Sequence, residues 1–231
     1  MKTQFVNRRE AGEELATKLT AYADRPDVLV LALPRGGVPV GFAVARALYV
    51  LLDVFLVRKL GVPDHEELAM GAVASGGVRV LNPDVVEQLQ IPASLIDTIA
   101  DRELQEIARR ERHYRARRPA VEVQGRTLIL VDDGLATGAT MRAAVTALRR
   151  RHPVRVIVAV PTAASEACAE LRTEVDEVVC ARTPEPFYAV SLWYDDFTQV
   201  SDEEVRDLLA AAARGRDPFA PVPAQPANRV V

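Results

Sequence analysis

Short apolar runs alternate with amphipathic segments along most of this chain, and this alternation constrains its fold more than any other feature. Parallel strands need long crossover connections, which are usually helices, and both faces of the resulting sheet become covered. The pattern therefore predicts an α/β fold with a central, mostly parallel β-sheet flanked by helices. The apolar runs expected to form buried strands are Val28–Leu33, Val54–Val57, Leu128–Val131, Val156–Val160 and Glu177–Cys180.

Helical periodicity and capping residues predict where the helices lie. Ser94 with Asp97, and Ser201 with Glu204, have the spacing of capping boxes at helix starts. The pair Gly76-Gly77 separates two apolar runs, which is typical of a β-hairpin turn. The expected helices are Arg8–Ala23, Val40–Leu52, Ser94–Arg117, Ala139–Arg151, Ala163–Leu171 and Asp202–Ala213.

Length and composition indicate one globular domain. The chain has 231 residues, 49% of them hydrophobic, and we expect a domain over residues 1–213 with its core at about 28–180. Four prolines among the last 18 residues predict a mobile tail from 214 to 231. A net charge of −3 argues against a polycation that binds nucleic acid.

The same composition narrows the class of protein further. Cys168 and Cys180 are too few for a four-cysteine zinc site, and we expect reduced thiols. No window holds about 18 uninterrupted apolar residues, so no membrane span is expected. A soluble cytoplasmic protein is the resulting expectation.

The stretch from Leu128 to Thr140, LILVDDGLATGAT, carries the strongest chemical signal. An apolar strand ends at Asp132-Asp133, a turn with two glycines follows, and two threonines lead into a helix. Ligands of open α/β sheets bind at the carboxyl ends of strands, where a helix N-terminus attracts phosphate. The two carboxylates suit a diol or a bound Mg²⁺ instead. A phosphorylated sugar matches both halves; the alternative is that the acids only end a strand and cap a helix.

Two other phosphate-binding motifs are absent from the sequence. A P-loop carries a lysine before its Ser or Thr, and residues 134–140 contain none. The second glycine cluster, Arg35–Gly41, lacks the G-x-G-x-x-G spacing of dinucleotide-binding folds. The sequence also contains no G-x-S-x-G motif, which would have indicated a covalent nucleophile.

Three segments together resemble the type I phosphoribosyltransferases, which use phosphoribosyl diphosphate (PRPP). Val131–Thr140 resembles their PRPP signature, Val28–Gly37 their first strand and diphosphate loop, and Phe55–Lys59 the base of their flexible loop. The resemblance spans about Val28 to Cys180. The chain resembles in particular bacterial phosphoribosyltransferase-domain proteins with a C-terminal FYAV and QVSDEEV pattern. The resemblance implies the type I phosphoribosyltransferase fold. It also implies a small hood over the base, built from the termini and residues 60–120.

The resemblance also implies roles for individual residues. Asp132 and Asp133 would hold the ribose hydroxyls, directly or through Mg²⁺. Arg58 and Lys59 would neutralise the departing diphosphate. These four residues form the expected catalytic set. The expected 5-phosphate site is Ala136, Thr137, Gly138, Ala139 and Thr140. The expected diphosphate site is Arg35, Gly36 and Gly37, with a non-proline cis peptide at Pro34–Arg35.

Other features keep two interpretations each. Pro161, Thr162, Trp193 and Tyr194 are candidates for the base pocket, and the aromatic rings could instead only pack the C-terminal helix. Pro63–Ala69 is polar and is the expected lid; His65 within it either meets substrate or is merely exposed. The arginine-rich segment 102–118 is expected to form a solvated ion-paired face or a dimer contact, with nucleic-acid binding as the weaker alternative.

The expected function is Mg²⁺-dependent transfer of a 5-phosphoribosyl group between PRPP and a nitrogenous base, releasing diphosphate, in nucleobase salvage. The expected partners are PRPP, a nucleobase-like acceptor and a second copy in a homodimer, with no nucleic acid or membrane. A non-catalytic PRPP sensor and a hydrolase of phosphoribosyl compounds are the alternatives. Arg58 and Lys59 favour an enzyme over a sensor.

Overall fold

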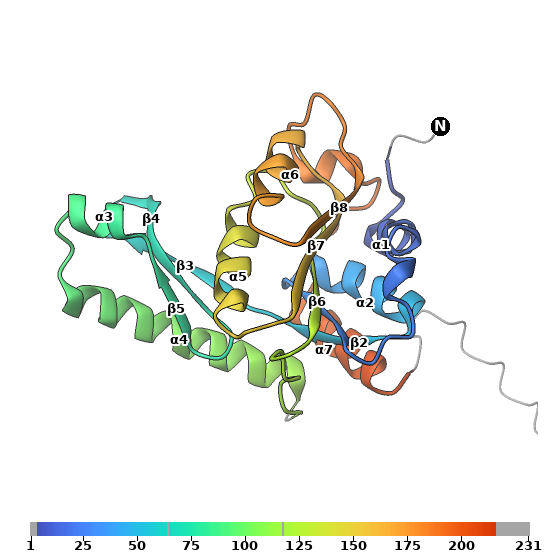
Figure 1. Cartoon of the computed structure of the whole chain (residues 1–231), viewed down its shortest axis with the longest axis horizontal. Helices are drawn as coiled ribbons and strands as arrows, with labels where there is room; N and C mark the ends of the chain where they lie inside the picture. The colour runs from blue at the N-terminus through green and yellow to red at the C-terminus, as the bar shows by residue number, and fades with distance from the viewer. Residues whose placement is uncertain (1–3, 64, 117, 216–231) are drawn as a thin grey trace, which may run out of the picture.

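A five-stranded parallel sheet forms the centre of the molecule (Figure 1). The computed structural model describes residues 4–63, 65–116 and 118–215. The strand order is β2-β1-β6-β7-β8, and every neighbouring pair is parallel, as the sequence predicts. The strands are β1 (Val28–Ala32), β2 (Leu51–Val54), β6 (Thr127–Val131), β7 (Arg155–Thr162) and β8 (Glu177–Arg182).

Helices cover both faces of this sheet because its strands are apolar on both sides. Leu29 and Leu31 of β1 belong to a core shared with α5 and α6, whereas Val28 and Val30 belong to a core shared with α1 and α2. Alternate residues of a strand point to opposite faces, which explains this division. The helices are α1 (Arg8–Thr17), α2 (Gly37–Leu48), α5 (Ala139–Arg149) and α6 (Ser165–Leu171), with α7 (Asp202–Ala213) packed on α2.

A second sheet forms an arm that extends from the body beside a long helix (Figure 1). Its antiparallel strands are β3 (Val57–Val62), β4 (His65–Ala74) and β5 (Val78–Leu81), followed by α3 (Pro83–Gln88) and α4 (Ala93–Arg115). Gly76 and Gly77 have φ of +80° and +77° in the β4–β5 turn, so the predicted hairpin is confirmed. The expected lid is wrong as a loop, because His65–Ala69 lies within β4.

Several predicted boundaries also differ from the structure; the first helix, for example, ends at Thr17 rather than Ala23. The run Val54–Val57 is not one strand, because β2 ends at Val54 and β3 begins at Val57. The second helix begins at Gly37 rather than Val40 and ends at Leu48, followed by Tyr49 at φ 55°. The first capping box is wrong because α4 starts directly after Pro92 without a side-chain cap. The second is confirmed at its N-cap, since Ser201 Oγ accepts a hydrogen bond from the Glu204 N–H at 3.0 Å.

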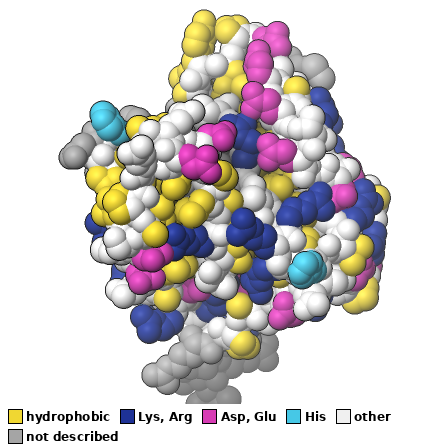
Figure 2. Space-filling view, turned by 60° about the vertical axis from the view of Figure 1, so that its left-hand side comes forward, with side chains coloured by type: hydrophobic (Ala, Val, Ile, Leu, Met, Phe, Trp, Pro, Cys, Tyr) yellow, Lys and Arg dark blue, Asp and Glu magenta, His cyan; other side chains and the backbone are white. Residues whose placement is uncertain are grey.

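The basic side chains of α4 pair with nearby acids. Glu106 accepts hydrogen bonds from Arg109 and Arg110, which confirms the ion-paired face at this part of the helix. Arg115 instead is buried and contacts Asp53 of β2 at 2.9 Å. Figure 2 likewise shows Lys and Arg side chains interspersed with Asp and Glu over one face of the molecule.

Cys168 of α6 and Cys180 of β8 form a disulfide, so the expectation of reduced thiols is wrong for this structure. The two residues meet because α6 packs directly against β8. Within the described segments, no helix is both long and apolar enough to cross a membrane. Of the expected tail, residues 216–231 lie outside the described residues.

Candidate functional site

The loop after β1 lies directly against the two acids that follow β6. Leu33 N–H donates to the carbonyl of Val131 at 2.9 Å, which brings the two loops together. A β-carbon on Gly36 would lie 2.0 Å from Asp133 Oδ2, and one on Gly37 would lie 2.7 Å from the Val131 carbonyl oxygen. Only glycine fits this approach at both positions. The expected cis peptide Pro34–Arg35 is confirmed in this loop.

The acid pair is half-buried and held in place by its own backbone. Asp132 Oδ1 accepts a hydrogen bond from the Asp133 N–H at 2.8 Å. Burial raises the pKa of Asp132 well above its usual value, and the neighbouring Asp133 carboxylate raises it further. Burial also raises the pKa of Asp133, while the Arg8 guanidinium opposes that shift. Two adjacent carboxylates in this position form a strong acceptor site for ligand hydroxyls.

Arg8 of α1 contacts the acid pair, and this contact was not predicted from the sequence. Its Nε lies 2.8 Å from Asp133 Oδ2, and its Nη1 donates to the carbonyl of Thr198 at 2.8 Å. The guanidinium lies 3.9 Å from the centroid of the Phe197 ring. Tyr194 adds a hydrogen bond from its hydroxyl to the Asp133 carbonyl at 2.5 Å. No local pattern marks Arg8, because its contacts join the two ends of the chain.

The turn before α5 is open to solvent at a helix N-terminus. Gly138 is buried, has φ of +70° and is the N-cap residue of α5. Ala136, Thr137, Ala139 and Thr140 around it are exposed. The Ala139 N–H donates to Thr137 Oγ1 at 3.5 Å. The turn thus offers a helix N-terminus with two exposed threonines, an arrangement that suits a phosphate.

Polar atoms without partners lie where the base pocket was predicted. Among the residues that the structure describes, two buried side-chain polar atoms have no hydrogen-bond partner: Oγ1 of Thr162 and Nε1 of Trp193. Thr162 ends β7, and its carbonyl accepts from the Leu135 N–H of the acid loop at 3.0 Å. Trp193 lies in a 3₁₀ helix, Val190–Trp193, and stacks on Phe187 at 6.3 Å between ring centroids. Buried polar groups are normally satisfied, so an absent partner is informative here.

The other two residues predicted for the base pocket, Pro161 and Tyr194, are engaged in contacts within the fold. Pro161 is buried within β7. Tyr194 is buried between Phe5 and Phe197, with ring centroids at 5.5 and 5.2 Å, and its hydroxyl already donates to the Asp133 carbonyl. Tyr194 therefore packs the C-terminal segment onto the acid loop.

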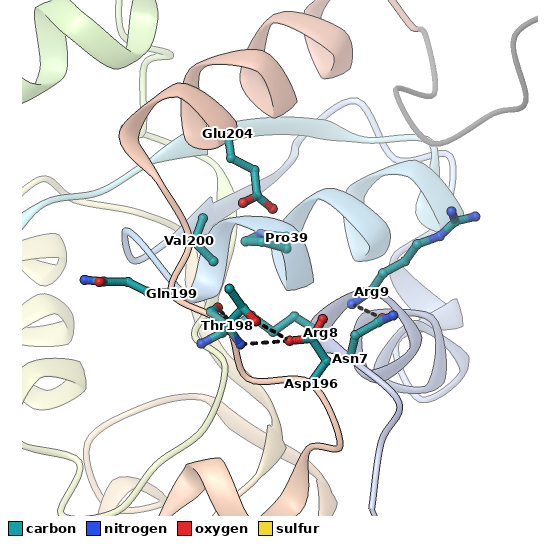
Figure 3. Close-up of a pocket in the computed structure, with 9 residues that line it drawn as sticks. All are labelled: Asn7, Arg8, Arg9, Pro39, Asp196, Thr198, Gln199, Val200 and Glu204. Carbon is teal, nitrogen blue, oxygen red and sulfur yellow. Dashed lines mark hydrogen bonds between the residues drawn. The ribbon is translucent and has the colours of Figure 1, made fainter.

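A pocket of about 440 Å³ lies beside Arg8, between the first turns of α1, α2 and α7 (Figure 3). Asp196 accepts two hydrogen bonds from Thr198, which fixes the loop that forms one wall. The lining residues are Asn7, Arg8, Arg9, Pro39, Asp196, Thr198, Gln199, Val200 and Glu204. Arg8 thus lines the pocket and also contacts Asp133.

Comparison with known proteins identifies the family. The family model described as "Phosphoribosyl transferase domain" matches residues 4–188. The chain belongs to this family. Its central parallel sheet with flanking helices is the α/β fold that the type I resemblance implies.

Two relatives of this phosphoribosyl transferase family member are similar over most of its length. A Mycobacterium tuberculosis H37Rv protein named "Putative phosphoribosyl transferase" is 45% identical over 210 residues, 91% of this chain and 47% of that protein. The chain therefore spans about half the length of the curated relatives it matches. The crystal structure of TT1426 from Thermus thermophilus is 43% identical with a TM-score of 0.79, covering 89% of this chain and 97% of that chain.

The basic residues predicted to meet diphosphate lie in three different environments of this phosphoribosyl transferase chain. Arg58 on β3 forms an ion pair with the largely buried Glu103 of α4, and Lys59 beside it is exposed. Arg35 Nη1 lies 3.9 Å from Asp202 Oδ1 at the start of α7. Among the described residues, no hydrogen bond or ion pair joins any of the three to the acid pair. His65 is exposed on β4.

The acid pair suits part of a Mg²⁺ site. Within the described residues, no group of three or more His, Cys, Asp or Glu is placed to hold a metal ion. Asp132 and Asp133 nevertheless offer carboxylate oxygens, the ligands that Mg²⁺ prefers, and Mg²⁺ usually keeps water or substrate oxygens for its other positions. Because Arg8 holds Asp133 Oδ2, these two residues fit the ion only together with substrate or water ligands.

Proposed function

We propose that this chain transfers a 5-phosphoribosyl group between PRPP and a nitrogenous base, releasing diphosphate in a Mg²⁺-dependent reaction. One observation carries the proposal: the diphosphate loop touches the acid pair, with the Gly36 backbone against the Asp133 carboxylate. The open turn before α5 follows the acids within a few residues. The proposed diol site thus adjoins one candidate phosphate site and precedes the other by a few residues, which suits a sugar carrying a phosphate at each end.

Each part of PRPP has a proposed partner. The 5-phosphate binds the turn 136–140, which combines the N-terminus of α5 with two exposed threonines. The ribose hydroxyls donate to Asp132 and Asp133. The diphosphate binds the backbone of Gly36 and Gly37, with Arg35 beside it. Mg²⁺ bound with the substrate supplies positive charge for the leaving diphosphate.

The proposed reaction needs positioning and charge rather than a covalent intermediate. The C1–O bond breaks and its electron pair leaves with diphosphate, so positive charge develops on the sugar as in glycoside chemistry. The lone pair of an acceptor nitrogen forms the new C1–N bond, and the proton of that nitrogen leaves to solvent. The acid pair stabilises the developing sugar cation electrostatically.

We propose that Thr162 and Trp193 meet the acceptor base. Their unpartnered polar atoms offer one hydroxyl and one N–H, and the Trp193 ring offers a stacking surface. We also propose that residues 1–213 form the phosphoribosyltransferase domain and that the protein acts as a homodimer. Its proposed role is nucleobase salvage in the cytoplasm.

The test is release of diphosphate from PRPP and Mg²⁺ against a panel of purine, pyrimidine and nicotinate-type acceptors. Asp132→Asn and Asp133→Asn are the matched variants. Release that depends on one acceptor and falls in both variants supports the transferase. Equal release from the wild type and both variants would contradict it.

A PRPP sensor without catalysis is the second candidate, and the pairing of Arg58 with Glu103 favours it. That ion pair engages a cation that the transferase needs near its leaving group. Tight PRPP binding with no diphosphate release for any acceptor would support the sensor.

A further inference from the structure

We propose that Arg8 is a positioning residue that fixes the Asp133 carboxylate for recognition of the ribose 2- and 3-hydroxyls. The inference rests on the proposed function, because it assigns the acid pair to a ribose. It gives the N-terminal helix a defined task in substrate selection. Neither the PRPP signature nor the two loops around it contains this residue.

Arg8 and the Gly36 backbone both restrain the Asp133 carboxylate. Arg8 Nε contacts Oδ2 at 2.8 Å, and the two side chains are only 11% and 15% exposed. The Gly36 backbone also approaches the same carboxylate closely, since a β-carbon there would lie 2.0 Å from Oδ2. The side chain therefore cannot rotate without losing a charge-assisted hydrogen bond or moving a backbone segment. One oxygen, Oδ1, is left for a ligand.

Only a guanidinium can make all the contacts of Arg8 together. Arg8 donates from Nε to Asp133 and from Nη1 to the Thr198 carbonyl, while its guanidinium carbon lies 3.9 Å from the centroid of the Phe197 ring. Lysine has one compact ammonium group and no flat face, so it cannot hold both acceptors and the ring in this geometry. Arg8 therefore sets the position of Asp133 relative to the segment 194–198.

Arg8 also brings a positive charge to the acid pair. Two adjacent half-buried carboxylates repel each other and would repel a phosphorylated sugar. One guanidinium at 2.8 Å offsets this repulsion without occupying both acids. Discrimination of a diol depends on acceptors held at fixed positions, because misplaced acceptors gain little from a second hydroxyl.

The experiment compares two sugar phosphates by calorimetric titration: ribose 5-phosphate and 2-deoxyribose 5-phosphate. They differ in the 2-hydroxyl alone, so the ratio of their dissociation constants reports the acid pair directly. We expect the wild type to prefer the ribose compound by about tenfold, the worth of one hydrogen bond to a charged group. Arg8→Gln is expected to bring this ratio close to one.

Matched variants separate positioning from folding. Arg25→Gln removes an arginine that pairs with Asp27 away from the candidate site, and should keep the wild-type ratio. Arg8→Lys and Phe197→Leu, each of which removes part of the geometry, should give intermediate ratios. Should Arg8→Gln not fold, these two variants decide: wild-type ratios in both overturn the inference.

The remaining outcomes distinguish the inference from the proposed function. A folded Arg8→Gln protein with the wild-type ratio overturns the role of Arg8 and leaves the phosphoribosyl site intact. Tighter binding of both sugars by Arg8→Gln also overturns it, because Arg8 would then obstruct the acids. A wild type that binds neither sugar phosphate nor PRPP removes the proposed function itself, and the inference with it.

Discussion

The backbone of Gly36 touches the carboxylate of Asp133: a β-carbon built on Gly36 would lie 2.0 Å from Oδ2. Gly36 follows the strand β1 and Asp133 follows β6, and these strands are neighbours in the sheet. The close approach therefore arises from sheet topology and not from local sequence. It makes the loop after β1 and the acid pair a single unit.

Gly36→Ala is expected to weaken PRPP binding by at least about tenfold. Gly36 has φ of −59°, which alanine adopts freely, so backbone strain is not the cause. The new methyl group must displace either the carboxylate or the loop, and such overpacking costs about 1–3 kcal/mol. Calorimetric titration with PRPP measures the effect.

Gly77→Ala is the control for this prediction. Gly77 has φ of +77° in the arm hairpin, and no atom lies within 4 Å of its would-be β-carbon. This variant should lose about 1 kcal/mol of stability through strain alone and keep its PRPP affinity. Unchanged affinity in Gly36→Ala would show that the loop and the acid separate easily.

The central sheet could be predicted from sequence because its strands are buried on both faces and therefore read as apolar runs. Asp53 of β2 is an exception, because it is a charged residue within a strand. Its charge is compensated by Arg115, 62 positions away, and no local rule reveals that pairing. Likewise the polar residues 65–69 resemble a loop but form part of β4 in the projecting arm.

The candidate site could be predicted only where it is local. The acids, the glycines and the turn 136–140 occupy two short segments with recognisable chemistry. Arg8 lies 125 positions from Asp133, and its role depends on how the two ends of the chain pack together. The pairing of Arg58 with Glu103 could not be predicted either, because Glu103 lies 45 positions further along the chain, in α4.

Arg115→Met is expected to destabilise the protein by about 3 kcal/mol. Arg115 and Asp53 are 10% and 7% exposed, and the substitution leaves a buried carboxylate without its cation. Asp53 also accepts the Val121 N–H at 3.0 Å, so it cannot simply turn outward. Urea unfolding measures the change.

Arg109→Met on the same helix provides the comparison. Arg109 is 62% exposed in its pair with Glu106, and exposed pairs contribute under about 1 kcal/mol. Equal losses in the two variants would contradict a special role for the buried pair.

Stability is expected to fall between about pH 10 and pH 12, in part through Tyr114. Burial, and next its hydrogen bond to Asp202 at 2.6 Å, raise the pKa of Tyr114 from 10.0 to about 12, while Arg110 and Arg35 oppose the shift. The folded state thus keeps a proton that the unfolded state loses above pH 10. Its contribution is complete below pH 10 and is lost as pH rises through 12.

Tyr114→Phe should flatten this pH dependence by roughly 1–2 kcal/mol across the same window. Urea unfolding at several pH values between 9 and 11.5 provides the measurement, with Tyr49→Phe as the control because Tyr49 is 80% exposed. Tyr22, whose pKa is also raised to about 12, keeps part of the slope in the variant. Identical slopes in the wild type and Tyr114→Phe would contradict the assignment.

Thr162→Val is expected to separate stability from acceptor recognition. The hydroxyl of Thr162 is fully buried and has no partner among the described residues, and such a group costs about 1–3 kcal/mol. Valine keeps the shape, so the free energy of unfolding should stay unchanged or rise by up to about 1 kcal/mol. The KM for the acceptor should rise about tenfold while PRPP affinity stays the same, because the base loses a hydrogen-bond partner.

Thr127→Val supplies the opposite case, because the Thr127 hydroxyl is equally buried but donates to Asp27 at 3.2 Å. It should lower stability by about 1 kcal/mol and leave the acceptor KM unchanged. Trp193→Phe, which removes the other unpartnered donor and keeps a ring for stacking, should resemble Thr162→Val in steady-state kinetics. A Thr162→Val protein that is less stable and has the wild-type KM would show that the hydroxyl serves the fold, and would assign the acceptor to another part of the molecule.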